Sequence, residues 1–277
     1  MEKLNIKSTV ELANGVQMPR IGLGVFQSAD GNEVINAIKY AVEAGYGLID
    51  TAAIYNNEAG VGEAIKSLAI PREQLFITSK VWNSDQGYES TLKAFDVSME
   101  KLGLDVLDMY LIHWPVKGKY NETWRAMEKL YANGKVRAIG VSNFLQHQLE
   151  DLISNANIVP MLNQVEYHPY LTQPGLANYC KQNKILLQAW APLMQGKIFE
   201  VDEIKLLAEK HGKSPAHIVI RWNLQKGILT IPKSVKKHRI EDNVNVFDFE
   251  LTEEDMAIID NLNRSERLGP DPDNFDF

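Results

Sequence analysis

Short apolar runs recur along this chain, and amphipathic stretches separate them. The runs fall at about 20–25, 47–50, 75–80, 107–112, 136–141, 160–165, 185–189 and 228–231, and their length and nearly continuous hydrophobicity are typical of buried parallel strands. Between them, apolar side chains recur at helical spacing, as Val34, Ile35, Ile38 and Val42 do within 33–44. The pattern therefore predicts a strand followed by a helix, repeated eight times.

Local signals mark where the elements begin and end. Helices are expected at about 33–44, 88–102, 121–132, 145–154, 200–211, 214–224 and 251–262. Ser214 and Thr252 are the expected N-caps of the last two helices, and Gly45 is expected just beyond the end of the first. The opening stretch 9–18 alternates around Asn14-Gly15 and predicts a β-hairpin with a type I′ turn.

This order of elements favours an α/β fold, a (β/α)8 TIM barrel with an N-terminal hairpin and extra helices before strand eight and at the C-terminus. The rival is an open, doubly wound sheet, which would carry a Gly-x-Gly-x-x-Gly turn after its first strand. Gly22 and Gly24 supply two of those glycines, but Gln27 stands where the third is needed. No linker divides the chain, so residues 1–277 are expected to form one domain.

Composition narrows the classes of function. The formal net charge of −7 disfavours binding to nucleic acids or membrane surfaces, which calls for a basic face. A single cysteine, Cys180, excludes an internal disulfide and fits a reducing compartment. The histidines show no metal-ligand spacing, and no signal peptide or membrane span is apparent. We therefore expect a soluble, cytoplasmic monomer without a bound metal.

Four side chains carry the strongest chemical signal. Asp50, Lys80 and His113 each stand where an apolar run ends, and Tyr55 follows five residues after Asp50. In a barrel, the C-terminal ends of the strands meet at one mouth, so these groups should converge. A tyrosine has an ordinary pKa near ~10, and an adjacent ammonium lowers it. The quartet therefore fits a general acid, Tyr55, whose pKa Lys80 lowers. Asp50 would hold Lys80 charged and in place, and His113 would orient the substrate oxygen by hydrogen bonding.

Polar or aromatic residues also follow the remaining strands. They are Ser142 and Asn143 after strand five, Gln164 at the end of strand six, Trp190 after strand seven, and Lys233 with Ser234 after strand eight. The segment 233–239 is unusually basic for an acidic protein and opens the next helix, which is a frequent place for phosphate in barrels. The sequence thus predicts a phosphate-bearing ligand beside the acid–base group.

With these residues in place, the whole chain resembles the aldo-keto reductase family. Three stretches carry the resemblance: Gly45-Tyr46-Gly47-Leu48-Ile49-Asp50-Thr51-Ala52, then Met127 through Arg137-Ala138-Ile139-Gly140-Val141-Ser142-Asn143-Phe144, and Ile231-Pro232-Lys233-Ser234 through Arg239 to Asn243. The resemblance implies a catalytic tetrad of Asp50, Tyr55, Lys80 and His113, with Tyr55 as the acid. It also implies NADPH-dependent reduction of aldehydes and ketones, an activity of the alcohol dehydrogenase (NADP+) type.

The resemblance assigns further roles residue by residue. Ser142, Asn143 and Gln164 would bind the nicotinamide amide, and Trp190 would stack on its ring. Lys233, Ser234 and Arg239 would hold the 2′-phosphate of NADPH/NADP+, and Asn243 the adenine. Pro192, Leu193 and Gln195 would lie along the pyrophosphate. Asp242 departs from the family pattern and adds a negative charge near the phosphate, which would soften the preference for NADPH over NADH.

Phe26, Trp82 and Trp114, together with His113, are expected to line the substrate pocket. Relatives with a longer C-terminal loop cover this pocket, so the short end of this chain implies an open pocket for small or varied carbonyls. Bacterial members of this length resemble glyoxal or methylglyoxal reductases and diketo-gluconate reductases, and methylglyoxal detoxification is one implied role.

Two other classes of function remain open from sequence. One is a cofactor-binding regulatory subunit, because the fold also serves as a redox-sensing partner of channels. The other is a lyase or isomerase that uses Lys80 as a Schiff-base amine. The tetrad argues against both.

Overall fold

The computed structural model describes residues 4–275 and contains the expected barrel. Its strands are β3 (Leu23–Gly24), β4 (Leu48–Asp50), β5 (Phe76–Val81), β6 (Leu107–Ile112), β7 (Val136–Ser142), β8 (Leu162–Glu166), β9 (Leu186–Trp190) and β10 (Leu229–Thr230). They form one parallel sheet in chain order. Parallel bridges from Ile21 to Thr230 and from Gly24 to Lys233 join the first strand to the last and close the sheet. The predicted (β/α)8 barrel is confirmed.

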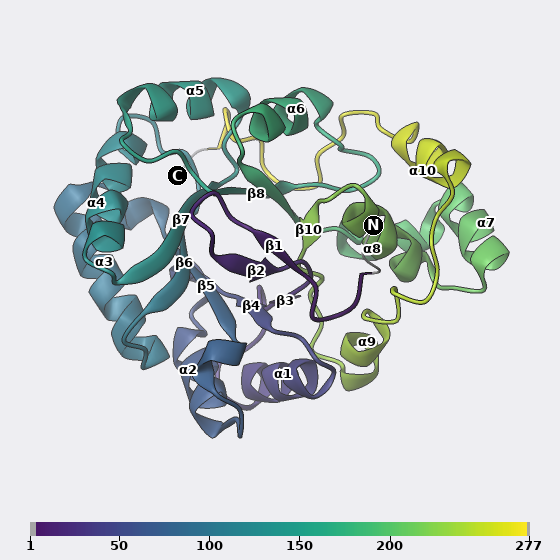
Figure 1. The fold of residues 1–277 in the computed structure, drawn as a ribbon, viewed down its shortest axis with the longest axis horizontal. Helices are drawn as coiled ribbons and strands as arrows, with labels where there is room; N and C mark the ends of the chain where they lie inside the picture. Colours follow the sequence, from purple (N-terminus) through teal and green to yellow (C-terminus); the bar gives the residue numbers. More distant parts are fainter. Residues whose placement is uncertain (1–3, 276–277) are drawn as a thin grey trace.

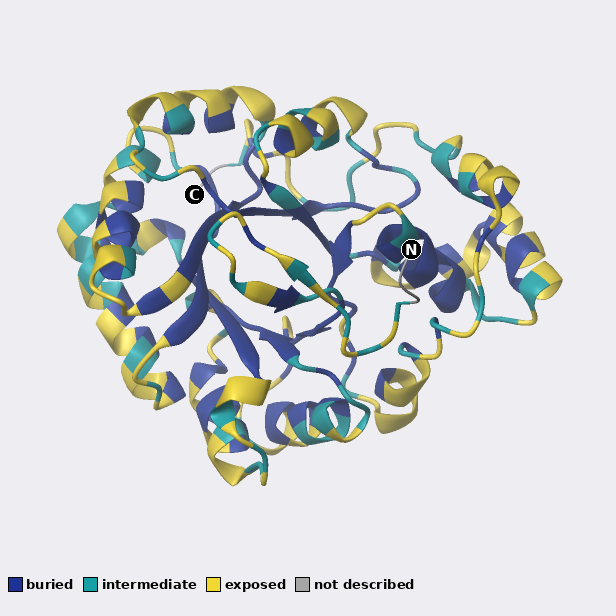
Figure 2. Ribbon diagram, in the orientation of Figure 1, coloured by how far each residue is buried: buried dark blue, intermediate teal, exposed yellow. Residues whose placement is uncertain are grey.

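Helices surround the sheet (Figure 1). They are α1 (Asn32–Glu43), α2 (Glu58–Ser67), α3 (Tyr88–Leu102), α4 (Tyr120–Ala132), α5 (Gln146–Asn155), α6 (Pro174–Gln182), α7 (Asp202–His211), α8 (Pro215–Gln225), α9 (Lys237–Asp242) and α10 (Glu253–Asp260). Every residue of β5, β6 and β8 is buried. Most helices are buried on one face and exposed on the other, whereas residues 216–224 of α8 are all buried (Figure 2). The core is therefore the barrel interior and the layer between strands and helices.

The N-terminal hairpin is present, but its turn differs from the prediction. β1 (Thr9–Glu11) pairs antiparallel with β2 (Gln17–Pro19). A type I′ turn needs a positive φ at both central residues. Gly15 has a φ of 86°, whereas Asn14 is not among the residues with a positive φ. The amide of Gly15 donates to the Leu12 carbonyl and that of Leu12 to the Val16 carbonyl, so the loop is longer, with glycine at its last position. The predicted type I′ turn is wrong.

Asn14 instead holds the hairpin against the barrel. Its side-chain amide donates to the Arg137 carbonyl at 2.9 Å and to the Tyr131 hydroxyl at 3.2 Å. Arg137 is the second residue of β7, so the hairpin covers the N-terminal end of the barrel and leaves the opposite mouth free for chemistry.

The expected caps are confirmed. Ser214 accepts from the His217 amide and Thr252 from the Asp255 amide, while Gly45 follows α1 with a φ of 96°. The apolar pattern did not reveal α2 and α6. Between residues 4 and 275, no helix is long and apolar enough to cross a membrane.

Candidate active site

Three of the four predicted catalytic side chains are linked by hydrogen bonds inside the barrel mouth. The Lys80 Nζ donates to Asp50 Oδ1 at 2.5 Å, to the Thr51 carbonyl at 2.9 Å and to the Tyr55 hydroxyl at 3.4 Å. Asp50 ends β4, Lys80 lies within β5, and Tyr55 ends a short 3-10 helix, Ala53–Tyr55, just after β4. Adjacent parallel strands therefore place an acid, an amine and a phenol in a row.

Lys80 is a fully buried cation, with none of its surface exposed. Burial by itself lowers the pKa of the ammonium, but the charge of Asp50, Tyr55 and the hydrogen bonds to both outweigh it. The net pKa of Lys80 therefore lies above its ordinary value of 10.5. The amine stays protonated, and a protonated amine cannot attack a carbonyl, which disfavours the Schiff-base hypothesis.

Tyr55 behaves differently from the expectation. Burial raises the pKa of the phenol, Lys80 lowers it, and the Asp50 charge raises it again. Lys80 therefore acts on the pKa in the predicted direction, but burial outweighs it and the net direction is upward. A raised pKa keeps Tyr55 protonated at neutral pH, which is the form that donates a proton.

His113 follows β6 and completes the cluster without a hydrogen bond to it. Its ring meets the Tyr55 ring edge-on at 5.6 Å between centroids and the Trp82 ring at 5.1 Å. Burial, followed by the Lys80 charge, holds the pKa of His113 well below its ordinary value of 6.5. Its Nδ1 is buried without a hydrogen-bond partner. His113 is thus a neutral imidazole, able to donate a hydrogen bond from one ring nitrogen.

The residues predicted to hold the nicotinamide amide form a network that reaches the same carboxylate. Gln164 Nε2 donates to Asp50 Oδ2 and to Gln188 Oε1, both at 2.7 Å. The Ser142 hydroxyl donates to the Gln164 carbonyl at 2.8 Å, and Asn143 Nδ2 donates to the Ser142 hydroxyl at 3.1 Å. Asn143 Oδ1 in turn accepts from Trp190 Nε1 at 2.7 Å. The structure thus brings together Ser142, Asn143, Gln164 and Trp190.

Two buried residues of this region escaped the sequence analysis. Gln188 lies in the middle of β9, where a polar residue in an apolar run was a usable signal. Asn57 is fully buried, and its amide donates to the Val25 and Ser28 carbonyls at 2.9 and 3.1 Å while its Oδ1 accepts from the Thr51 hydroxyl at 2.7 Å. Asn57 therefore ties the Tyr55 loop to the loop that carries Phe26. Nothing in its sequence position predicts these partners.

The basic segment surrounds the start of α9. Lys233 Nζ reaches the Gln27 carbonyl at 3.2 Å, Ser234 is buried with its hydroxyl accepting from the Lys236 amide, and Arg239 is exposed on α9. Asn243, at the end of α9, is buried. Asp242 directs a carboxylate oxygen to within 3.2 Å of His217 Nε2 on α8.

The loop after β9 combines predicted cofactor contacts with unusual backbone. Ala191, Met194 and Gln195 have φ values of 50°, 53° and 54°, in the left-handed region that disfavours residues other than glycine. Strain of this kind concentrates at ligand-binding loops. Pro192 is buried, whereas Leu193 is half-buried and Gln195 is exposed.

This set of groups fits a nicotinamide dinucleotide phosphate. Amide and hydroxyl groups beside the Trp190 face suit a carboxamide on an aromatic ring. The exposed cations Lys233 and Arg239 beside Ser234 suit a phosphate. The residues that would hold the two ends of the cofactor therefore lie at or after the C-terminal ends of β7, β8, β9 and β10.

The aromatic residues predicted for the substrate pocket lie around the tetrad. Phe26 is 53% exposed with its ring 5.0 Å from that of Tyr55, and Trp82 contacts His113. Trp114 is stacked by Phe275, with centroids 4.5 Å apart and an interplanar angle of 26°. The short C-terminal stretch thus reaches the mouth and covers Trp114. The expectation that the chain end leaves the pocket open is wrong at Trp114.

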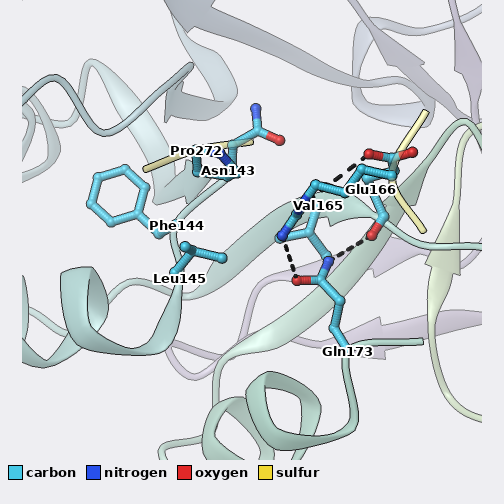
Figure 3. A pocket seen from close by; sticks show the side chains of 8 residues that line it. Asn143, Phe144, Leu145, Val165, Glu166, Gln173 and Pro272 are labelled. Atoms are coloured by element: carbon cyan, nitrogen blue, oxygen red, sulfur yellow. Dashed lines mark hydrogen bonds and ion pairs between the residues drawn. The ribbon is translucent and has the colours of Figure 1, made fainter. Parts of the chain in front are cut away.

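The same stretch packs against the end of β8. Arg267 and Pro272 line a shallow crevice there together with Asn143, Phe144 and Glu166 (Figure 3). The C-terminal stretch therefore packs over residues that the sequence analysis assigned to the cofactor site.

Comparison with known proteins agrees with this geometry. A model of the aldo/keto reductase family matches residues 20–264. The chain is 59% identical over 273 residues to glyoxal reductase of Bacillus subtilis (strain 168), covering 99% of both chains. It is 45% identical over 272 residues to methylglyoxal reductase DkgA of Escherichia coli (strain K12), covering 97% of this chain and 98% of that one.

Among solved structures, a mutant of Gox0644 in complex with NADPH superposes with a TM-score of 0.93 at 40% identity, covering 98% of this chain and 99% of that one. The match extends over nearly the whole chain in both sequence and structure. This protein is therefore an enzyme of the aldo/keto reductase family.

Proposed function

We propose that this enzyme uses NADPH to reduce small aldehydes and ketones to alcohols, with Tyr55 as the proton donor. The observation that carries the proposal is the buried row of Asp50, Lys80 and Tyr55 beside the ring of His113. NADPH, when bound, would supply the hydride to the carbonyl carbon. Support for this cofactor comes from the Gox0644 relative, which was solved with NADPH.

The tetrad divides the remaining work. Neutral His113 donates a hydrogen bond that orients the carbonyl oxygen. Tyr55 transfers its proton to that oxygen as the carbon gains the hydride, so the substrate leaves as a neutral alcohol. The Lys80 ammonium, 3.4 Å from the Tyr55 hydroxyl, stabilises the phenolate left behind. Asp50 keeps Lys80 charged and in place.

Small dicarbonyl compounds are the proposed substrates, with keto sugars as a second group. The names of two relatives, glyoxal reductase and methylglyoxal reductase, support this choice. The rings of Phe26 and Trp82 lie against Tyr55 and His113, and aromatic side chains beside polar groups suit a small, flat carbonyl compound.

The direct test mixes the purified enzyme with NADPH and methylglyoxal and follows the loss of NADPH absorbance. Glyoxal, keto sugars and larger aldehydes, each with NADPH and with NADH, complete the panel. We expect turnover of the small dicarbonyls with NADPH and weaker turnover with NADH. Tight NADPH binding without turnover of any carbonyl would contradict the proposal and favour a regulatory subunit, and borohydride trapping of substrate on Lys80 would favour a Schiff-base enzyme.

We further infer that the chain acts as one domain, as a monomer, in the cytoplasm. One closed sheet draws strands from Leu23 to Thr230, which supports a single domain. The exposed large apolar side chains of the described residues, among them Val97, Val159 and Ile258, come from separate segments of the chain, which supports a monomer. Cys180 is buried, with a pKa that burial raises to about 12, which fits an unreactive thiol in a reducing compartment. Light scattering on the purified protein tests the monomer.

A further inference from the structure

Residues 266–269, which we call the strap, bind the end of β8. The Leu268 amide donates to Glu166 Oε1 at 2.6 Å, and the Gly269 amide lies 3.3 Å from both carboxylate oxygens of Glu166. The amide of Glu266 donates to the Tyr170 carbonyl at 3.1 Å. In Figure 1 the C-terminal stretch, drawn in yellow, runs from α10 back past β8. The strap is therefore anchored by its backbone at two points.

Glu166 is the buried anchor. None of its surface is exposed, and a buried carboxylate is stable only when donors surround it. Besides the two strap amides, His168 Nε2 lies 2.9 Å from Oε1 and Arg267 Nη1 lies 4.0 Å from Oε2. Gln173 Nε2 donates to the Glu166 backbone carbonyl at 2.7 Å (Figure 3). Glu166 thus fixes the strap to the same strand end that carries Gln164.

Gly269 lies directly against the indole of Trp190. A Cβ atom at position 269 would lie 2.5 Å from Cη2 and 3.3 Å from Cζ3 of Trp190. The opposite edge of the indole is held by the hydrogen bond from Nε1 to Asn143 Oδ1. The ring is therefore fixed at both edges, and it cannot tilt away from a side chain at 269 without loss of that hydrogen bond.

We propose that the strap positions Trp190 for the cofactor, with Gly269 as the contact and Glu166 as the latch. The proposal rests on the proposed function, in which the nicotinamide ring stacks on this indole. A fixed indole presents its face at one angle, so cofactor binding does not have to order it. Gly269 and Glu166 touch no reacting atom and are positioning residues.

The test is a double-mutant cycle on NADPH binding, measured by isothermal titration calorimetry. Gly269→Ala introduces the clash, and Trp190→Phe removes the Cη2 atom with which it clashes. In the otherwise wild-type enzyme, Gly269→Ala should weaken NADPH binding about tenfold, within the range of coupling seen between residues in contact. In the Trp190→Phe background the same change should alter the dissociation constant less than about twofold. The matched control is Gly175→Ala on α6, where an added Cβ meets nothing within 4 Å.

The cycle separates positioning from a merely structural role. A structural role would lower the melting temperature of Gly269→Ala in both backgrounds and leave the NADPH dissociation constant unchanged, and that result would overturn the proposal. Wild-type enzyme that fails to bind NADPH would overturn the proposed function as well. Binding by wild type without coupling between positions 269 and 190 would overturn the strap alone.

Glu166→Gln tests the latch by a separate measurement. Loss of the carboxylate charge should loosen the strap, because one of its two acceptor oxygens becomes a donor amide. Trypsin should then cut after Arg267 faster than in wild type, as measured by intact mass, while NADPH binding weakens. An unchanged cutting rate at Arg267 would remove Glu166 from the latch role and leave the contact of Gly269 with Trp190 to be judged by the cycle.

Discussion

Each end of the barrel holds a buried carboxylate with cationic partners, and the partners differ. At the mouth, Asp50 pairs with the fully buried Lys80, which also contacts the Tyr55 hydroxyl. At the opposite end, Asp108 near the start of β6 binds Arg72 at 2.6 Å and Arg137 at 2.7 Å. Both arginines are partly exposed, at 28% and 45% of their side chains.

The different partners suit the two carboxylates to different roles: Asp108 stabilises the barrel, and Asp50 belongs to the proposed catalytic group. Asp108 also accepts from the Ile77 amide at 2.8 Å, so it joins β5, β6 and β7 to one another and has no phenol or imidazole to act on. Guanidinium groups keep their charge at all ordinary pH values and cannot shift a proton. At the mouth, a lysine is coupled to an acid and to a phenol whose pKa it influences. Barrels place chemistry at the C-terminal face and stabilising contacts at the N-terminal face, and this chain does so with two versions of the same pair.

Removal of the phenol should affect chemistry alone. Tyr55→Phe deletes the proton donor, so kcat for methylglyoxal should fall by about a thousandfold, within the range for loss of a general acid. Among residues 4–275, the deleted hydroxyl has a single hydrogen bond, the one from Lys80 at 3.4 Å, so the melting temperature and NADPH affinity should stay close to wild type. Steady-state kinetics and calorimetry check this, and retention of more than a tenth of the activity would remove Tyr55 from the role of acid.

Removal of the buried Lys80 ammonium should lower both the activity and the stability of the enzyme. Lys80→Met leaves the Asp50 carboxylate buried without a cation, which should lower the free energy of unfolding by about 3–5 kcal/mol, as measured in urea. The pair Asp50→Asn with Lys80→Met removes both charges, so it should recover most of that stability and remain inactive. Recovery of activity in the double variant would contradict the role of Lys80 beside Tyr55.

The equivalent change at the other end should lower stability alone. Asp108→Asn removes the charge that two arginines share, and both remain hydrated, so the loss should be about 1–3 kcal/mol in urea unfolding. Because Asp108 lies near the start of β6 and His113 follows its end, kcat/KM should change less than about twofold. A large loss of kcat/KM with little loss of stability would show that the two ends are coupled.

The smallest effect expected is in the pH profile. Burial raises the pKa of Tyr55, so the phenol keeps its proton below that value, and burial lowers the pKa of His113 well below 6.5, so the ring stays neutral above it. The rate of carbonyl reduction should therefore stay flat from about pH 6.5 to about pH 9, without the inflection of an ordinary histidine. Oxidation of the alcohol needs the phenolate and should rise with pH. Asp108→Asn should show the same profile, and an inflection near neutral pH would contradict the neutral state of His113.

The strand ends were the part of the site that the sequence predicted best. Asp50, Lys80 and His113 could be placed together because parallel strands end on the same side of a sheet, and strands are recognised from local periodicity. The buried residues that form hydrogen bonds around them could not be placed in the same way. Asn57 and Gln188 are bonded to segments distant in the chain, and no local pattern encodes such contacts.

The net pKa shift of Tyr55 and the position of the C-terminal stretch both differ from the expectation, and for the same reason. The sign of the Tyr55 shift depends on how much water is excluded around the phenol, which is a property of the packed mouth. The C-terminal stretch was expected to leave the pocket open because it is short, yet Gln148 binds Asp273 across 125 residues and Phe275 stacks on Trp114. Length indicates how far a segment can reach and says nothing of where it docks.

The amino-acid sequence by itself determined the (β/α)8 order, the placement of Asp50, Lys80 and His113 at one end of the strands and the basic segment after strand eight, because each depends on periodicity or on which strand a residue ends. Only the tertiary structure decided the upward direction of the Tyr55 pKa shift, the position of Asn57 and the contact of Gly269 with Trp190. Burial and long-range contact arise when the barrel closes, and both depend on the position of every neighbour at once.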